Sequence, residues 1–182
     1  MALSMTVTAG GLALHVPAAQ ADTVIAPAGA SVTTVEAVKT TASKKATSKK
    51  VLSKKQAKAA RQKVKAHKAV AVAKKQIGDP YRYGATGPHA FDCSGLVQFA
   101  WRKAGVKIPR VTNSQFAGIR KKVSYKNLKP GDLMFFRGLG HVGMYIGKGK
   151  MVHSPSSGKT VRVEKLNGWR KSSFAGAVRP GL

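Results

Sequence analysis

The 182-residue sequence predicts an α+β fold in which N-terminal helices pack on a central antiparallel sheet. Up to residue 119, apolar residues recur at helical spacings of three and four, whereas after Gly131 they alternate with the two-residue period of strands. Helices that come first and are followed by consecutive strands lead to an antiparallel sheet with the helices on one side. The length allows one ordinary domain and an extension.

Three helices are expected before the strands. The first, His67–Ile77, is moderately amphipathic and ends at Gly78, and Thr112–Ile119 forms a shorter third helix. The second starts after the N-cap residue Asp92 and stops at Gly105. Its buried face consists of Leu96, Val97, Phe99, Ala100, Trp101 and Ala104.

Five strands follow, each a short run of apolar or alternating residues separated by turn signals. The expected strands are Leu133–Phe136, Val142–Ile146, Met151–His153, Thr160–Val163 and Phe174–Val178.

The N-terminus resembles a secretory signal. Residues 1–21 contain a small apolar run, and Ala-Gln-Ala at 19–21 fits the cleavage pattern before Asp22, although no Lys or Arg precedes the apolar run. The run is too short to span a bilayer. The chain is therefore expected to be secreted to the bacterial cell wall, with a signal peptide that lacks its basic start.

Residues 22–65 are expected to form a disordered linker rich in Ala and Lys, and residues 66–182 the folded domain. Like charges at helical spacing oppose a helix in the Lys-rich part, which is free of acids from residue 44 to 65. The formal net charge of the chain is +27, and both the linker and the domain contribute to it. The partners should therefore be anionic.

Two kinds of anionic polymer fit this charge. Lys/Ala-rich tails bind nucleic acid through phosphate contacts, but export would take the protein away from DNA. Anionic cell-wall polymers are therefore the expected partner of the Lys-rich segment, and no nucleic-acid partner is expected. The default oligomeric state is a monomer.

Cys93 is the only cysteine, which excludes an intramolecular disulfide. It lies at the start of the second expected helix, where the helix dipole and free amides favour a thiolate. A lone cysteine is also compatible with a small buried hydrophobic residue. Its partners decide between these interpretations.

A thiolate nucleophile needs a base and a group that orients the base. Of the five histidines, His15 lies in the signal, His67 in the basic run and His89 in a loop, whereas His141 and His153 lie on neighbouring expected strands. Side chains alternate between the two faces along a strand. The imidazoles of His141 and His153 therefore share one face only if His153 pairs opposite Gly143 or another residue on the same face of that strand as Gly143.

A strict two-residue turn at Lys148 and Gly149 would instead place His153 opposite Met144, which has the wrong parity. A bulge or three-residue loop is therefore expected around the turn at 147–150, with Gly143 leaving room for an imidazole. One cysteine and scattered histidines lack the spacing of metal ligands, so no metal and no cofactor are implied.

Six ordered motifs together resemble the NlpC/P60 family of cell-wall cysteine peptidases, over about residues 66–180. They are Pro-Tyr-Arg-Tyr-Gly at 80–84, Phe-Asp-Cys-Ser-Gly-Leu-Val at 91–97, Ile-Pro-Arg at 108–110 with Gln115, Lys-Pro-Gly-Asp-Leu at 129–133, Gly-His-Val-Gly-Met-Tyr-Ile-Gly at 140–147, and Val-His at 152–153.

The resemblance implies a papain-like α+β fold and hydrolysis of amide bonds in peptidoglycan stem peptides, in many members between the γ-carboxyl of D-glutamate and diaminopimelate. It implies that Cys93 is the nucleophile, His141 the base and His153 the residue that orients His141. Tyr81, twelve residues before the cysteine, corresponds to the family tyrosine near the oxyanion site.

Arg110, Asp92 and Ser94 are the candidate substrate-binding residues. Arg110 is suited to hold a substrate carboxylate and is equally compatible with a solvated loop residue. Asp92 and Ser94 also fit a role in building the helix start.

Three other functions remain open. A non-catalytic wall-binding protein would keep the fold and use its basic charge. A nucleic-acid-binding protein would need to stay in the cytoplasm and would not use the histidines. A related amidase or acyltransferase would apply the same residues to another substrate, because a catalytic triad does not define the bond it cleaves.

Overall fold

The computed structural model describes residues 36–182, with side chains described from residue 51 onward. The expected signal peptide at 1–21 and the first part of the expected linker, 22–35, lie outside the described residues. Residues 42–182 form the compact unit described below.

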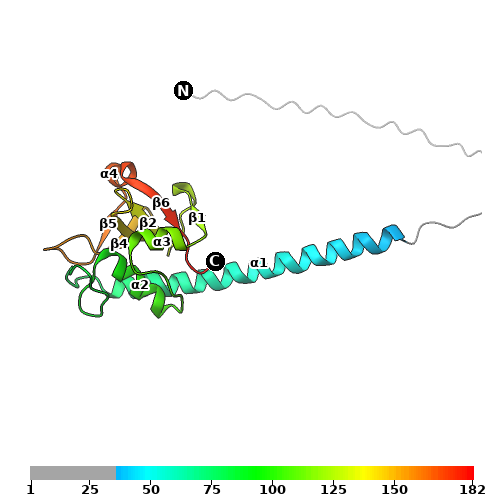
Figure 1. Cartoon of the computed structure of the whole chain (residues 1–182), viewed down its shortest axis with the longest axis horizontal. Coiled ribbons are helices and arrows are strands. Elements are labelled where there is room, and N and C mark those ends of the chain that lie inside the picture. The colour runs from blue at the N-terminus through cyan, green and yellow to red at the C-terminus, as the bar shows by residue number, and fades with distance from the viewer. Residues whose placement is uncertain (1–35) are drawn as a thin grey trace, which may run out of the picture. The chain divides into compact units, whose positions relative to one another are not determined.

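The unit combines helices with a six-stranded antiparallel sheet, so the α+β prediction is confirmed (Figure 1). The order of strands across the sheet is β1-β6-β2-β3-β4-β5. The helices are α1 (Glu36–Lys75), α2 (Cys93–Lys103), α3 (Thr112–Gly118) and α4 (Gly168–Ser172), with a 3₁₀ turn η1 (Tyr125–Asn127). The strands are β1 (Lys122–Val123), β2 (Leu133–Phe136), β3 (His141–Gly147), β4 (Lys150–His153), β5 (Arg162–Lys165) and β6 (Phe174–Val178).

Helix α1 begins far earlier than the helix expected at His67, so the Lys-rich part of the expected linker is helical from Glu36. Ala and Lys are strong helix formers, whereas a like-charge pair opposes a helix by only a few tenths of a kcal/mol, about 0.2–0.5. The C-terminal part of α1 is also held by burial, since Ala66, Ala69 and Ala73 are buried in the core. Propensity and packing together outweigh the repulsion.

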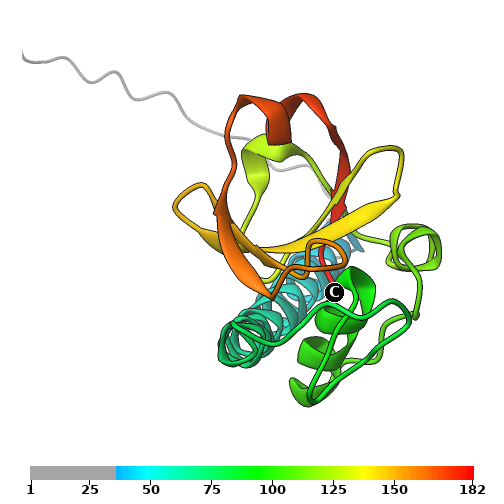
Figure 2. The ribbon, with the colours of Figure 1, turned by 90° about the vertical axis from the view of Figure 1, so that its left-hand side faces the viewer.

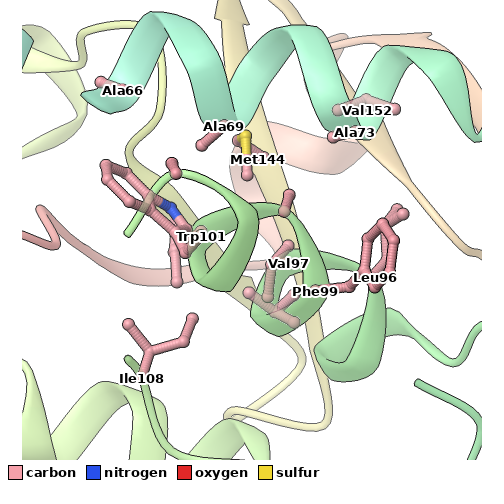
Figure 3. Packing of buried hydrophobic residues seen from close by; sticks show 14 of the residues in the cluster. Ala66, Ala69, Ala73, Leu96, Val97, Phe99, Trp101, Ile108, Met144 and Val152 are labelled. Atoms are coloured by element: carbon pink, nitrogen blue, oxygen red, sulfur yellow. The ribbon is translucent and has the colours of Figure 1, made fainter. Parts of the chain in front are cut away.

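Two apolar clusters lie on opposite faces of the sheet, as the alternation of β2 requires: Leu133 and Phe135 belong to one cluster, Met134 and Phe136 to the other. Helix α2 and the C-terminal part of α1 cover the first face (Figure 2). Figure 3 shows the alanines of α1 and the apolar residues of α2 around Met144 and Val152 of the sheet.

Strand β5 starts at Arg162, two residues after the start expected from the pattern. The preceding residues pair with a different segment: the amide of Val161 donates to the carbonyl of Asp79, and Thr160 forms a bridge with Pro80. Strand β5 pairs with β4 from Arg162 opposite His153 to Lys165 opposite Lys150, which brings Glu164 into the sheet. No helix in the described part of the chain is both long and apolar enough to cross a membrane.

Candidate active site

The start of α2 is organised by Asp92, as its N-cap position predicts. Its carboxylate accepts from the amide of Gly95 at 2.6 Å and binds the guanidinium of Arg110, with 2.5 Å between Nη2 and Oδ2. Nη1 of Arg110 also donates to Oγ of Ser94 at 2.7 Å. Burial raises the pKa of the Asp92 carboxyl, but the hydrogen bonds from Arg110 and Gly95 outweigh burial and hold this pKa below its usual value. These three side chains therefore build the helix start as one ionic cluster.

Cys93 is the first residue of α2, and its sulfur lies against the backbone amide of Val142, next to His141 at the start of β3. Burial raises the pKa of the thiol, the Val142 amide lowers it by less, and the Asp92 carboxylate raises it further. The amides expected at the helix start are present, but burial outweighs them. The expectation that the start of α2 favours a Cys93 thiolate is therefore wrong for the protein without substrate. The thiol needs a neighbouring base to lose its proton.

The two strand histidines lie side by side. His141 Nε2 and His153 Nδ1 are 2.9 Å apart, and the rings meet edge to face at 79°. The register shifts between Tyr145 and Gly147, and Met144 pairs with Val152, so the continued register places His153 opposite Gly143. The bulge required by the parity argument is therefore present.

Gly143 leaves the space that His153 occupies. A Cβ atom at this position would lie 2.8 Å from Sδ of Met151 and 3.3 Å from Cβ of His153. The first distance is shorter than real Cβ contacts allow, so a side chain here would displace its neighbours.

Glu164 of β5 completes the row of polar groups and is not among the site residues predicted from the sequence. Its Oε2 lies 3.0 Å from His153 Nε2, and its Oε1 accepts from Arg170 Nε of α4 at 2.5 Å. The hydrogen bond from Arg170 is the main reason why the pKa of Glu164 falls to about 2. Glu164 is therefore ionised at neutral pH and can only accept hydrogen bonds.

An ionised Glu164 determines the tautomers of both histidines. His153 must carry its proton on Nε2 to donate to Glu164, which leaves Nδ1 of the neutral ring as an acceptor. His141 must then donate from Nε2, and its Nδ1 is left unprotonated. Burial is the largest cause of the low pKa values of His141, about 3, and His153, about 4, so both rings are neutral near pH 7. The row of three groups therefore presents one free basic nitrogen on His141.

A pocket of about 430 Å³ opens above Cys93, and its walls include Tyr81, Asp92, Ser94 and Arg110. Tyr81 is close enough to the sulfur for Cys93 to add to the effect of burial in raising the pKa of its hydroxyl. Five of the seven residues expected at the site therefore line this pocket.

The two expected histidines do not line this pocket. His141 lines a second pocket, and His153 is completely buried. Arg110 is held by Asp92 and Ser94 and is no solvated loop residue. In the described part of the chain, no group of three or more His, Cys, Asp or Glu side chains is arranged to hold a metal ion.

Two solved structures share this fold. An NlpC/P60 family protein from Bacillus cereus superposes with a TM-score of 0.58 at 36% identity, covering 63% of this chain and 39% of that one. The peptidoglycan hydrolase RipB of Mycobacterium tuberculosis superposes with a TM-score of 0.59 at 29% identity, covering 66% of each chain.

Curated relatives match over the same domain. The probable endopeptidase p60 of Listeria monocytogenes is 38% identical over 107 residues, which are 56% of this chain and 22% of that protein. The bifunctional muramidase/DL-endopeptidase CwlT of Bacillus subtilis is 43% identical over 103 residues, which are 53% of this chain and 31% of CwlT. The chain thus spans about a fifth to a third of the length of these relatives.

The model of the NlpC/P60 family matches residues 78–178. This segment runs from the end of α1 to the last residue of β6 and contains Cys93, His141, His153 and Glu164. Because the match extends over more than half of the chain, the protein belongs to the NlpC/P60 family.

Proposed function

We propose that the protein is a secreted cysteine endopeptidase that hydrolyses amide bonds in peptidoglycan stem peptides. The observation that carries this proposal is the free Nδ1 of His141, presented by the hydrogen-bonded row from Glu164 on the residue before Val142, whose amide contacts the thiol of Cys93 at the start of α2. The names of the relatives support it, since p60 is a probable endopeptidase and RipB a peptidoglycan hydrolase.

The first half of the reaction forms a thioester. His141 Nδ1 takes the proton of the Cys93 thiol, and the sulfur attacks the scissile carbonyl carbon. The Cys93 amide and the Tyr81 hydroxyl donate to the developing oxyanion. The carbon–nitrogen bond then breaks, and the leaving amine takes the proton from His141.

The second half returns the enzyme to its starting state. Water gives a proton to His141 Nδ1 and attacks the thioester carbonyl, and the carbon–sulfur bond breaks. The proton on His141 then restores the thiol of Cys93. Arg110, held by Asp92 and Ser94, lines the same pocket as Cys93 and is proposed to hold a carboxylate on the acyl half of the substrate.

The proposed bond is the one between the γ-carboxyl of D-glutamate and diaminopimelate, which the family resemblance implies. The test is digestion of purified peptidoglycan by the full chain and by Cys93→Ala, followed by mass spectrometry of the soluble fragments. Wild type should release fragments cut at this bond, and the variant should release none while unfolding at the same temperature. Fragments cut at another amide would keep the enzyme class and correct the bond.

If wild type and Cys93→Ala both match the buffer control on walls of several compositions, the peptidase proposal fails. A non-catalytic wall-binding function would then be favoured.

The Lys-rich part of α1 is proposed to bind anionic cell-wall polymers, with the protein acting as a monomer at the wall. Lys54, Lys55 and Lys58 are exposed, and no acid lies between residues 44 and 65 to neutralise them. The triple Lys→Gln variant keeps good helix formers in place and should lose sedimentation with purified walls at low salt. Unchanged sedimentation would overturn this role, and analytical ultracentrifugation checks the monomer.

A further inference from the structure

Besides the pocket that contains Cys93, the domain has a second pocket, of about 160 Å³. The consecutive residues Gly140 and His141 line the two pockets, Gly140 the first and His141 the second. The other residues that line the second pocket are Arg137, Pro155, Ser156, Lys159, Arg162 and Arg170.

Four of these seven residues are cationic, and among the described residues Glu164 is the carboxylate that forms ion pairs with them. Glu164 binds Arg170 and, at 3.4 Å, Arg162. Among the described residues, Arg137 and Lys159 have no carboxylate partner. The pocket therefore has an excess of positive charge that the protein itself does not neutralise.

Two of these cations, Arg170 and Arg137, are held in place by contacts with aromatic rings. Arg170 is only 7% exposed, and its guanidinium lies 4.6 Å from the ring centroid of Trp169 and 5.5 Å from that of Phe136. Arg137 lies over the same Trp169 ring at 5.0 Å. The Trp169 ring contacts both guanidinium groups, and Phe136 and Glu164 also hold that of Arg170. Both cations are thus fixed by neighbouring side chains, unlike solvated surface lysines.

The proposed reaction determines which half of the substrate meets this pocket. The leaving amine takes its proton from His141, so the amine-bearing half must lie against His141, while the acyl half is bonded to Cys93. We propose that the second pocket binds a carboxylate on the amine-bearing half of the substrate, through Arg137 and Lys159 with support from Arg162. This inference rests on the proposed function and adds a specificity site to it.

A bound carboxylate would also assist the proton transfer. Burial is the main cause of the low pKa of His141, and the charges of Arg170 and Arg137 lower this pKa further. An anion between these cations offsets part of their repulsion toward a protonated His141. The substrate thereby favours the imidazolium that the leaving amine needs.

The test compares two synthetic stem peptides that differ in one group on the amine-bearing residue, a free carboxylate or its primary amide. Each is cleaved by the wild-type full chain and by Arg137→Gln/Lys159→Gln, both exposed positions at which Gln keeps an extended polar side chain. The matched control is Lys148→Gln/Lys150→Gln, which removes two exposed charges from the β3–β4 turn, outside both pockets. Arg162 and Arg170 stay unchanged because they contact Glu164.

Wild type should cleave the carboxylate peptide with a kcat/KM about tenfold or more above that for the amide, the range expected for charge-assisted hydrogen bonds. The pocket variant should lose this preference by slowing on the carboxylate peptide alone, and the control variant should keep it. Equal slowing on both peptides, or an unchanged preference, would overturn the carboxylate site. Cleavage of the amide peptide by wild type and not by Cys93→Ala supports the proposed function independently. If wild type cleaves neither peptide, the proposed function fails, and the site with it.

Discussion

The Nε2 atom of His153 lies 3.0 Å from Oε2 of Glu164, on the side of the imidazole opposite to His141. Because Glu164 is ionised, this contact assigns the proton of His153 to Nε2 and, through the next hydrogen bond, leaves Nδ1 of His141 free. A carboxylate one strand away thus sets the tautomer of His141, the proposed base.

Glu164→Gln should lower kcat by about tenfold or more, a part of the 10²–10⁴ that a positioned acid–base group contributes. The amide has the same shape, but it can either donate or accept and carries no charge to hold Arg170. Steady-state kinetics should show the loss in kcat with little change in KM, together with a shifted pH profile. Glu164→Asp should recover part of the rate, since it keeps the charge. A variant that loses stability but keeps kcat and its pH profile would show a purely structural role.

Gly143→Ala should destabilise the domain by about 1–3 kcal/mol, the usual effect of overpacking a core. The added Cβ atom would lie 2.8 Å from Sδ of Met151 and would push against His153. Urea unfolding measures the stability, and peptide cleavage the effect on the base. The control is Gly168→Ala at the start of α4, where an added Cβ atom meets nothing within 4 Å. Equal stability of the two variants would contradict the close packing around His153.

Acid should destabilise the domain through its two buried histidines. Their pKa values of about 3 and 4 lie below the ordinary value of 6.5, so below pH 6.5 the unfolded chain binds more protons than the folded one. This contribution to stability is complete above that pH and is lost as the pH falls toward the folded-state values. Each histidine adds a slope of up to about 1.4 kcal/mol per pH unit.

Urea unfolding at pH 7, 6 and 5 measures this slope. His153→Gln removes one of the two titrating rings and should flatten the curve. A free energy of unfolding that stays level from pH 7 to 5 in the wild type would rule out two neutral buried rings.

Arg110→Lys should lower stability by about 1–2 kcal/mol, because a lysine cannot form the paired contacts of the guanidinium with Asp92 and Ser94. The KM for a stem peptide should rise as well if Arg110 also holds a substrate carboxylate. Arg102→Lys, on the exposed side of α2, is the matched control and should change neither value. Lower stability with an unchanged KM would leave Arg110 with its role at the helix start alone.

The parts of the fold that the sequence predicted are those encoded by local pattern. The N-cap at Asp92, the helices α2 and α3 and the strands β2, β3, β4 and β6 follow from spacing and from turn residues. Even the bulge near Gly147 could be predicted, because parity alone requires it once two histidines must share a face. Strand β1 has only two residues and α4 only five, too short for any period to be visible.

The site residues, like the elements of the fold, include some that the sequence predicts and others that it does not. A single cysteine at a helix start and histidines on adjacent strands stand out in the sequence, and the motifs around them identify the family. Glu164 gave a weaker signal in the sequence. It is one of only four acids after residue 65 and lies two residues after Arg162, as expected for the same face of a strand. The expected strand, however, ended one residue before it.

The sequence by itself determined the fold class, most of the helices and strands and the candidate nucleophile and base, because burial on one face of a helix or strand imposes a period on neighbouring residues. Only the tertiary structure decided how these elements meet. It placed Glu164 and Arg170 behind His153, gathered the cations beside His141 and buried the thiol of Cys93 enough to raise its pKa. These are contacts and fields between residues far apart in the chain, and their strength depends on distance and burial, which no local pattern contains.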